Sequence, residues 1–267
     1  MREYLSFFRL RLVTGLQYRT AALAGMATQF FWGFMEIMVF RAFYEADPSA
    51  YPMTMQATTS YVWLQQALLA FFGAWMFEGE IFDLIRNGNL AYELCRPVHI
   101  YDMWFARSIA LRLSRAFLRS IPILVVAAIL PEGYGIGLPA SPSAFLWFLV
   151  SLALGLLVMV SLHMMVYAAS LFTISGDGLR MMFCSIMEVL SGQIIPLPFF
   201  PEQVQRILEW NPFASTGNVP FRVYSGNLIG AEMVRAILIQ IFWLILLNVL
   251  GRRLAARGEK RAVVQGG

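Results

Sequence analysis

Stretches of helix length made almost entirely of apolar residues alternate with short charged segments along the chain. A bilayer core about 30 Å thick requires roughly 20 apolar residues per helix. A helix also satisfies its own backbone hydrogen bonds in lipid, whereas these runs are too long and too uniformly apolar for barrel strands. The pattern therefore predicts an all-α integral membrane protein with a single domain and six transmembrane helices, at residues 20–40, 58–77, 111–130, 144–171, 179–195 and 233–250.

The basic residues indicate how these spans are oriented. All but four of the 20 Lys and Arg residues fall on the side that both termini share, the exceptions being Arg41, Arg206, Arg222 and Arg235. Because cytoplasmic loops carry the excess of basic residues, we expect both termini in the cytoplasm and the chain in the cytoplasmic (inner) membrane. The net charge of +4 fits this bias and attraction to anionic membrane lipids. No basic patch is interleaved with a soluble fold, which argues against a nucleic-acid partner.

The two ends of the chain flank the six-span region, residues 20–251. Residues 1–19 predict an amphipathic helix lying in the plane of the membrane interface, with a plain continuation of the first span as the alternative. Residues 252–267 predict a basic cytoplasmic tail. The first apolar run is long enough to be an anchor rather than a cleaved signal. With 59% hydrophobic residues and a mean hydropathy of +0.64, the composition supports no separate soluble domain.

The third span carries three arginines on one helical face, Arg112, Arg115 and Arg119. Charge inside a membrane is rare and unfavourable, so we expect these side chains to extend toward cytoplasmic lipid headgroups. The alternative is a contact with an anionic substrate or with a partner helix.

The segment between spans two and three, residues 78–98, predicts two short helices on the cytoplasmic side. Ile81, Phe82 and Ile85 form an apolar helical face, and the sequence around Gly88 is typical of a turn. That face would be exposed unless something covered it, which indicates a docking segment. An ordinary solvated loop is the alternative.

The segment after the fifth span is rich in proline. Pro196, Pro198 and Pro201 are expected to break the span near its outer end. Residues 202–210 then predict a short amphipathic helix. Irregular backbone at membrane depth must be buried in protein or line a wet cavity, so this segment predicts a re-entrant or extracellular helical cap.

These last two segments resemble the permeases of ABC-2 type ATP-binding-cassette transporters. The resemblance rests on the sequence IIPLPFFP, the short helix after it and the NPF at 211–213; residues 85–97, IRNGNLAYELCRP, are similar to the viologen-exporter-like subgroup. It implies a permease that pairs with a second permease, identical or paralogous, and with two cytoplasmic ATPase subunits that hold ATP and Mg. It also implies that spans one, two and five enclose the transport path, and that the coupling to the ATPase is made by Ile81, Phe82, Asp83, Ile85, Arg86, Asn87 and Gly88.

The sequence contains no phosphate-binding loop that could hydrolyse ATP. Its one lysine, Lys260, lies outside any glycine-rich turn, so this chain is not expected to be an enzyme. If ATP drives the transport, another polypeptide must hydrolyse it. His99 and His163 lack metal-ligand spacing, and Cys95 and Cys184 lack a partner motif, so we expect no metal, no disulfide and no cofactor in this chain. His163 is expected to be a hydrogen-bonded helix-packing residue.

Polar residues inside the spans are candidates for the transport path, because intramembrane carboxylates tend to be functional. They are Gln29 and Glu36, which share a face of the first span, and Glu188 and Gln193. Alternatively, Glu36 reaches water or Arg41, and Glu188 pairs with another helix. With the family resemblance, these features predict the permease subunit of an ATP-driven exporter for a hydrophobic or amphipathic compound. The rivals are an ion-coupled secondary transporter that uses Glu36 and Glu188 and a lipid-modifying membrane enzyme.

Overall fold

The computed structural model describes residues 2–17, 19–47, 51–173 and 175–261, without the side chains of residues 2 and 19–24. Residues 1 and 18 of the predicted interfacial helix and the last six residues of the predicted tail therefore lie outside the described residues. Every regular element in the described ranges is helical, as predicted. The elements are α1 (Arg2–Leu16), α2 (Arg19–Ala46), α3 (Met55–Ala67), α4 (Leu69–Phe72), α5 (Gly79–Arg86), α6 (Leu90–Leu94), α7 (Ile100–Ile129), α8 (Pro142–Ser170), α9 (Asp177–Leu190), η2 (Leu197–Phe199), α10 (Glu202–Leu208), α11 (Asn218–Tyr224) and α12 (Gly230–Glu259).

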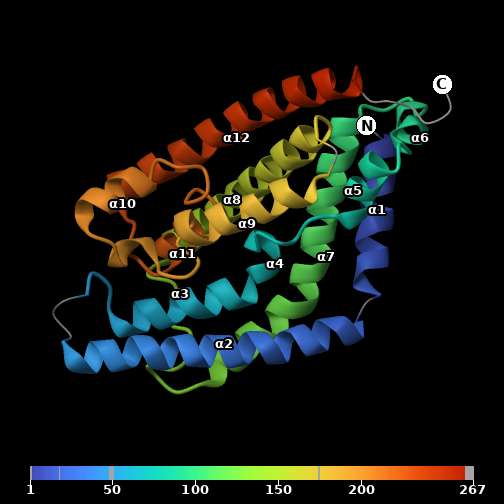
Figure 1. Cartoon of the computed structure of the whole chain (residues 1–267). Helices are drawn as coiled ribbons and strands as arrows, with labels where there is room; N and C mark the ends of the chain where they lie inside the picture. The colour runs from blue at the N-terminus through green and yellow to red at the C-terminus, as the bar shows by residue number, and fades with distance from the viewer. Residues whose placement is uncertain (1, 18, 48–50, 174, 262–267) are drawn as a thin grey trace.

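The longest helices carry most of the packing. Among the described helices, α8 and α12 are long and apolar enough to cross a membrane by length and composition alone, so the count of six spans stays a prediction. The two helices lie side by side (Figure 1), where buried Gln240 of α12 donates to the Ser151 carbonyl and accepts from its hydroxyl. Side-chain hydrogen bonds of this kind hold helices together where the hydrophobic effect does not.

The N-terminal helix is separate from the first predicted span. α1 ends at Leu16, and Figure 1 shows it turned away from α2 and lying along α7. A plain continuation of the first span is therefore wrong. The start of α1 and the end of α12 lie at the same end of the molecule as α5 and α6 (Figure 1).

The second predicted span is broken, so the expectation of one helix over residues 58–77 is wrong. α3 ends at Ala67, α4 adds one turn, and the chain leaves helical geometry at Gly73, whose φ and ψ are −57° and 122°. Glycine has low helix propensity. A buried arginine, described below, supplies the hydrogen-bond donors that a continued helix would have supplied.

The fifth predicted span ends earlier than residue 195. α9 stops at Leu190, and Gly192 has a φ of +77°, a left-handed conformation that glycine adopts without strain. At about 21 Å, α9 is shorter than a bilayer core. The prolines do not break this helix but begin the short ones that follow: Pro196 precedes η2, Pro198 lies within it and Pro201 precedes α10. α10 matches the predicted cap helix, whereas buried α11 was not predicted.

The segment between the second and third spans has the predicted form, with α5 and α6 joined by a turn at Gly88, whose φ is +68°. The reason given for a docking role was wrong, however. Ile81 is fully buried in the chain's own core, and Phe82 packs on Phe77 and Tyr167. The apolar face of α5 therefore packs on the chain's own core, with Ile81 fully buried and Phe82 and Ile85 half-buried. The polar residues Asp83, Arg86 and Asn87 remain exposed.

Candidate functional site

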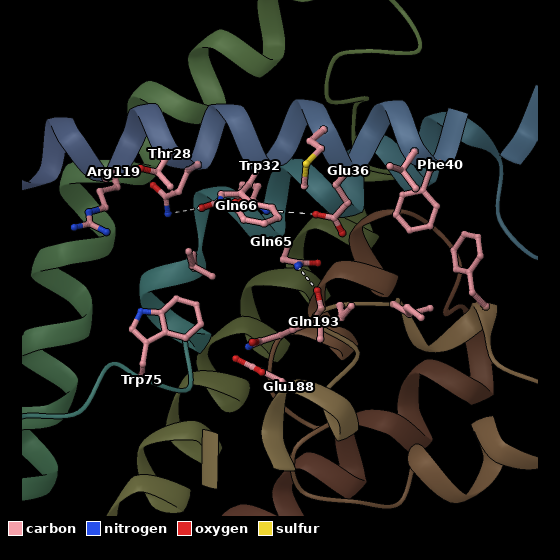
Figure 2. A pocket seen from close by; sticks show the side chains of 18 of the residues that line it. Thr28, Trp32, Glu36, Phe40, Gln65, Gln66, Trp75, Arg119, Glu188 and Gln193 are labelled. Carbon is pink, nitrogen blue, oxygen red and sulfur yellow. Dashed lines mark hydrogen bonds between the residues drawn. The ribbon is translucent and has the colours of Figure 1, made fainter. Parts of the chain in front are cut away.

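A cavity of about 970 Å³ lies between α2, the broken α3–α4 segment and the loop that follows α9. All four polar residues predicted for a transport path, Gln29, Glu36, Glu188 and Gln193, line it. Figure 2 shows Glu36 reaching into it from α2 and Glu188 from the opposite side. Sequence reasoning therefore selected residues that are far apart in the chain and that the fold brings together. We call this cavity the groove.

The walls of the groove are mostly apolar and partly open to the surroundings. Trp32 and Phe43 of α2 are each 52% exposed, and Trp75 of the unwound segment is 51% exposed. The remaining apolar lining, again mainly from α2 and the loop after α9, comprises Met35, Val39, Phe40, Tyr51, Leu69, Met76, Ile194, Ile195 and Phe199. Phe199 belongs to the proline-rich cap, so the cap forms part of this wall although Pro196, Pro198 and Pro201 do not line it.

Hydrogen bonds join α2 and α3 along the groove. The side chains of Trp63 and Gln66 pack against Gly33 of α2, where an added Cβ would lie 3.2 Å from each. On either side of this point, Gln29 donates to the Gln66 carbonyl at 2.9 Å, and the Gln66 side chain donates to Glu36 at 3.4 Å. Arg41 pairs with Glu45 at 2.9 Å, so the alternative in which Glu36 reaches Arg41 is wrong.

Two glutamines hold the loop after α9 against the broken span. Gln65 donates to the Gln193 carbonyl, and the Gln193 side chain donates to the Phe72 carbonyl at 2.7 Å. Phe72 is the last residue of α4. The unwound ends of two separate elements therefore stabilise each other beside the groove, which explains why both helices can end there.

Charges in the groove are unevenly placed. Glu188 is exposed on α9 and forms no salt bridge within the described ranges, so the alternative in which it pairs with another helix finds no support. The one arginine lining the groove is Arg119, whose guanidinium lies against Gly25 near the start of α2. Glu36 is eleven residues further along α2, about 16 Å at a helical rise of 1.5 Å.

The expectation that Arg112 extends toward lipid headgroups is wrong. Its side chain is fully buried, donating to the carbonyls of Phe71 at 2.5 Å, Met76 at 3.3 Å and Ala70 at 3.4 Å. It also donates to His163 Nδ1 at 2.9 Å. Because buried carbonyls need donors, Arg112 stabilises the unwound segment after α4.

His163 is the helix-packing residue that was predicted. Its ring receives the hydrogen bond from Arg112 and stacks on Phe77 with the ring centroids 3.8 Å apart. The imidazole therefore holds the arginine on one side and the unwound segment on the other.

A second cavity, of about 650 Å³, shares Trp75, Met76 and Arg119 with the groove. Its opposite wall is an ion cluster that sequence reasoning missed: Arg11 of α1 lies 3.1 Å from Glu80, and buried Arg107 of α7 pairs with Glu80 and lies 2.6 Å from Glu78. The cluster joins α1, α5 and α7. The opposite charges of these residues were visible in the sequence. No sequence periodicity, however, relates Arg11 or Arg107 to residues 78–80.

The two carboxylates of this cluster differ in their environments. Burial raises the pKa of the Glu78 carboxyl, although Arg107 and Arg11 oppose the shift. A hydrogen bond from Arg11 holds the pKa of the more exposed Glu80 below its ordinary value. The arginines therefore stabilise the ionised form of Glu80, whereas at Glu78 the effect of burial outweighs theirs.

The predicted coupling residues lie beside this cluster. Asp83 and Asn87 line a smaller cavity between α1, α5 and α6, and Arg86 forms an exposed ion pair with Asp83 at 2.7 Å. Residues 73–78 connect this region directly to the groove, since Trp75 lines the groove and Glu78 belongs to the ion cluster.

The described residues form an all-helical fold with two helices long and apolar enough to cross a membrane and an apolar, partly open groove, which fits a membrane protein of the transport type. The sequence model described as ABC-2 family transporter protein matches residues 30–266, and the chain belongs to this family. The family is a membrane component of transporters that is not itself catalytic. No curated protein is similar enough to the chain to count as a match.

Proposed function

We propose that this chain is the transmembrane permease subunit of an ATP-driven exporter that moves a hydrophobic or amphipathic compound across the cytoplasmic membrane. The observation that carries the proposal is the groove, because a largely apolar cavity with a few convergent polar groups is suited to such a compound. Most of its lining comes from the predicted first, second and fifth spans, and the rest includes Arg119 of the third span and Phe199 of the cap. These are the spans that the family resemblance assigns to the transport path.

The exposure of the groove supports a second permease, identical or paralogous, as the surface that closes it. Trp32, Met35 and Phe43 are all more than one third exposed on one side of α2. Two ATPase subunits holding ATP and Mg would supply the energy. Lipid would surround the remaining apolar surface.

Coupling to the ATPase is assigned to α5 and the turn after it. The exposed edge formed by Asp83, Arg86 and Asn87 would contact the ATPase, while buried Ile81 anchors α5 to the rest of the chain. Movement of α5 would then reach Trp75 through residues 73–78. The viologen-exporter-like subgroup and the cytoplasmic position of both termini belong to the same proposal.

The experiment that tests the assignment is co-purification. The full chain, tagged at one end, is expressed with a candidate ABC ATPase subunit and isolated in lipid nanodiscs. We expect a complex whose ATP turnover exceeds that of the ATPase alone. A chain that neither binds the ATPase nor changes its turnover would contradict the proposal.

One observation favours the ion-coupled rival enough to include it in the test. Glu36 and Glu188 line the same cavity, as proton-coupling carboxylates would. Liposomes that contain the chain without an ATPase separate the two functions. Transport driven by a proton gradient alone would favour the secondary transporter, and transport that requires ATP and the ATPase would favour the exporter.

A further inference from the structure

The amide side chains that line the groove use their N–H groups within the protein. Each amide nitrogen of Gln29, Gln65 and Gln193 already donates to a backbone carbonyl of the protein. The side-chain oxygens of Gln29 and Gln65 have no hydrogen-bond partner among the described residues, and neither does Glu36 Oε1. Gln29 is 3% and Gln65 is 8% exposed, so these are buried acceptors that lack donors. Buried polar atoms of this kind call for an explanation, and a ligand is one.

The charges of the groove select the sign of that ligand. Two carboxylates, Glu36 and Glu188, line it without an ion pair to any described residue. The compensating Arg119 lies near Gly25, about 16 Å from Glu36 along α2. The end of the groove that holds Glu36 therefore attracts positive charge.

Aromatic side chains complete the lining. Trp32, Phe40 and Phe199 belong to the groove wall, and aromatic rings bind both apolar groups and, through their faces, cations. A ligand that fits has an apolar body and a positively charged end.

Resting on the proposed function of the chain as a permease, we infer that the groove binds an amphipathic compound with a protonated primary or secondary amine, whose N–H groups donate to Glu36 and to the Gln65 oxygen. The N–H donors are essential to this assignment. A quaternary ammonium has the same charge but cannot fill empty acceptors, and a neutral alcohol has a donor without the charge. The apolar body lies against the aromatic wall.

Three probes with one body separate these properties: 4-phenylbutylamine, its N,N,N-trimethyl analogue and 4-phenylbutanol. Equilibrium binding to the full chain in neutral-lipid nanodiscs is measured for each at pH 7. Because a hydrogen bond to a charged group changes affinity by about tenfold or more, we expect the amine to bind at least about tenfold more tightly than both analogues. Equal affinity of the amine and the trimethyl probe would overturn the inference.

Two isosteric variants test the assigned residues. Glu36→Gln and Glu188→Gln each remove a carboxylate that could pair with a bound ammonium and should weaken amine binding about tenfold while leaving 4-phenylbutanol unchanged. Glu188 is exposed, so its variant is expected to fold even if the Glu36 variant does not. The control is Glu202→Gln on α10, a carboxylate that is 76% exposed and lies outside the groove, which should bind like the unmodified chain.

The outcomes also distinguish this inference from the proposed function. No binding of the amine, or binding unaffected by both groove variants, overturns the amine assignment. The permease assignment then stands or falls on co-purification with the ATPase, which requires no ligand.

Discussion

Replacing Arg112 with Met should destabilise the fold far more than the same change at Arg119. Both arginines lie on α7, two turns apart, and methionine fills much of the same volume. Arg112, however, is fully buried with four hydrogen-bond acceptors around it, whereas Arg119 lies half-buried at the groove. The comparison isolates the hydrogen bonds that hold the unwound segment.

The expected magnitude follows from the contacts. The bonds to Phe71 at 2.5 Å and to His163 at 2.9 Å are the short ones, and each charge-assisted bond contributes about 1.5–3 kcal/mol. Removing a buried charge also removes its desolvation penalty, which offsets part of the loss. The net free energy of unfolding should therefore fall by about 3 kcal/mol.

Thermal unfolding of the purified chain measures this. At about 2–4 °C per kcal/mol for a chain of this size class, Arg112→Met should lower Tm by about 6–12 °C. Arg119→Met should lower it by no more than about 3 °C. Equal shifts in the two variants would refute the role assigned to Arg112.

Three other predictions test the coupling segment, the ion cluster and the topology. Arg86→Glu with Gly88→Pro should leave membrane abundance normal but abolish stimulation of the ATPase, because charge reversal disrupts docking and proline cannot adopt the φ of +68°; normal stimulation would exclude this segment from coupling. Glu80→Gln should lower Tm at pH 7. The difference in Tm should vanish as the pH falls through the lowered pKa of Glu80, because the ionised carboxylate that the arginines stabilise is then lost. A difference in Tm that stays constant with pH in thermal scans would contradict this. In intact cells, an impermeant thiol reagent should label Leu138→Cys, a position 93% exposed. Native Cys95, with the other cysteine replaced, should be labelled only after permeabilisation. The reverse pattern would mean that the topology is inverted.

Local sequence signals predicted the local structure well. The turn at Gly88 and the helix α10 follow from glycine conformation and from the apolar pattern of nearby residues. One physical rule selected Gln29, Glu36, Glu188 and Gln193: polar groups inside membrane spans are energetically unfavourable and tend to be functional. The fold places all four in the lining of one groove.

The breaks in the helices could not be predicted because their causes are distant in the chain. An apolar run through residues 58–77 is equally compatible with one continuous helix. Only the fold places Arg112 against the carbonyls of Phe71 and Met76, where it replaces the helical hydrogen bonds. The same limit applies to Arg107, whose partner Glu78 lies on another element.

The most direct test of the central claim is to obstruct the groove in a working complex. With native cysteines replaced, Val39→Cys places a thiol on the groove wall at a position that is 49% exposed, and Leu238→Cys places one at a 59% exposed position of α12 outside it. Both are modified with a bulky maleimide, and ATP-driven uptake of a fluorescent amphipathic amine is measured in inverted membrane vesicles. We predict that modification at Val39 stops uptake while modification at Leu238 does not. Undiminished uptake after complete modification at Val39 would contradict the assignment of the groove as the transport path.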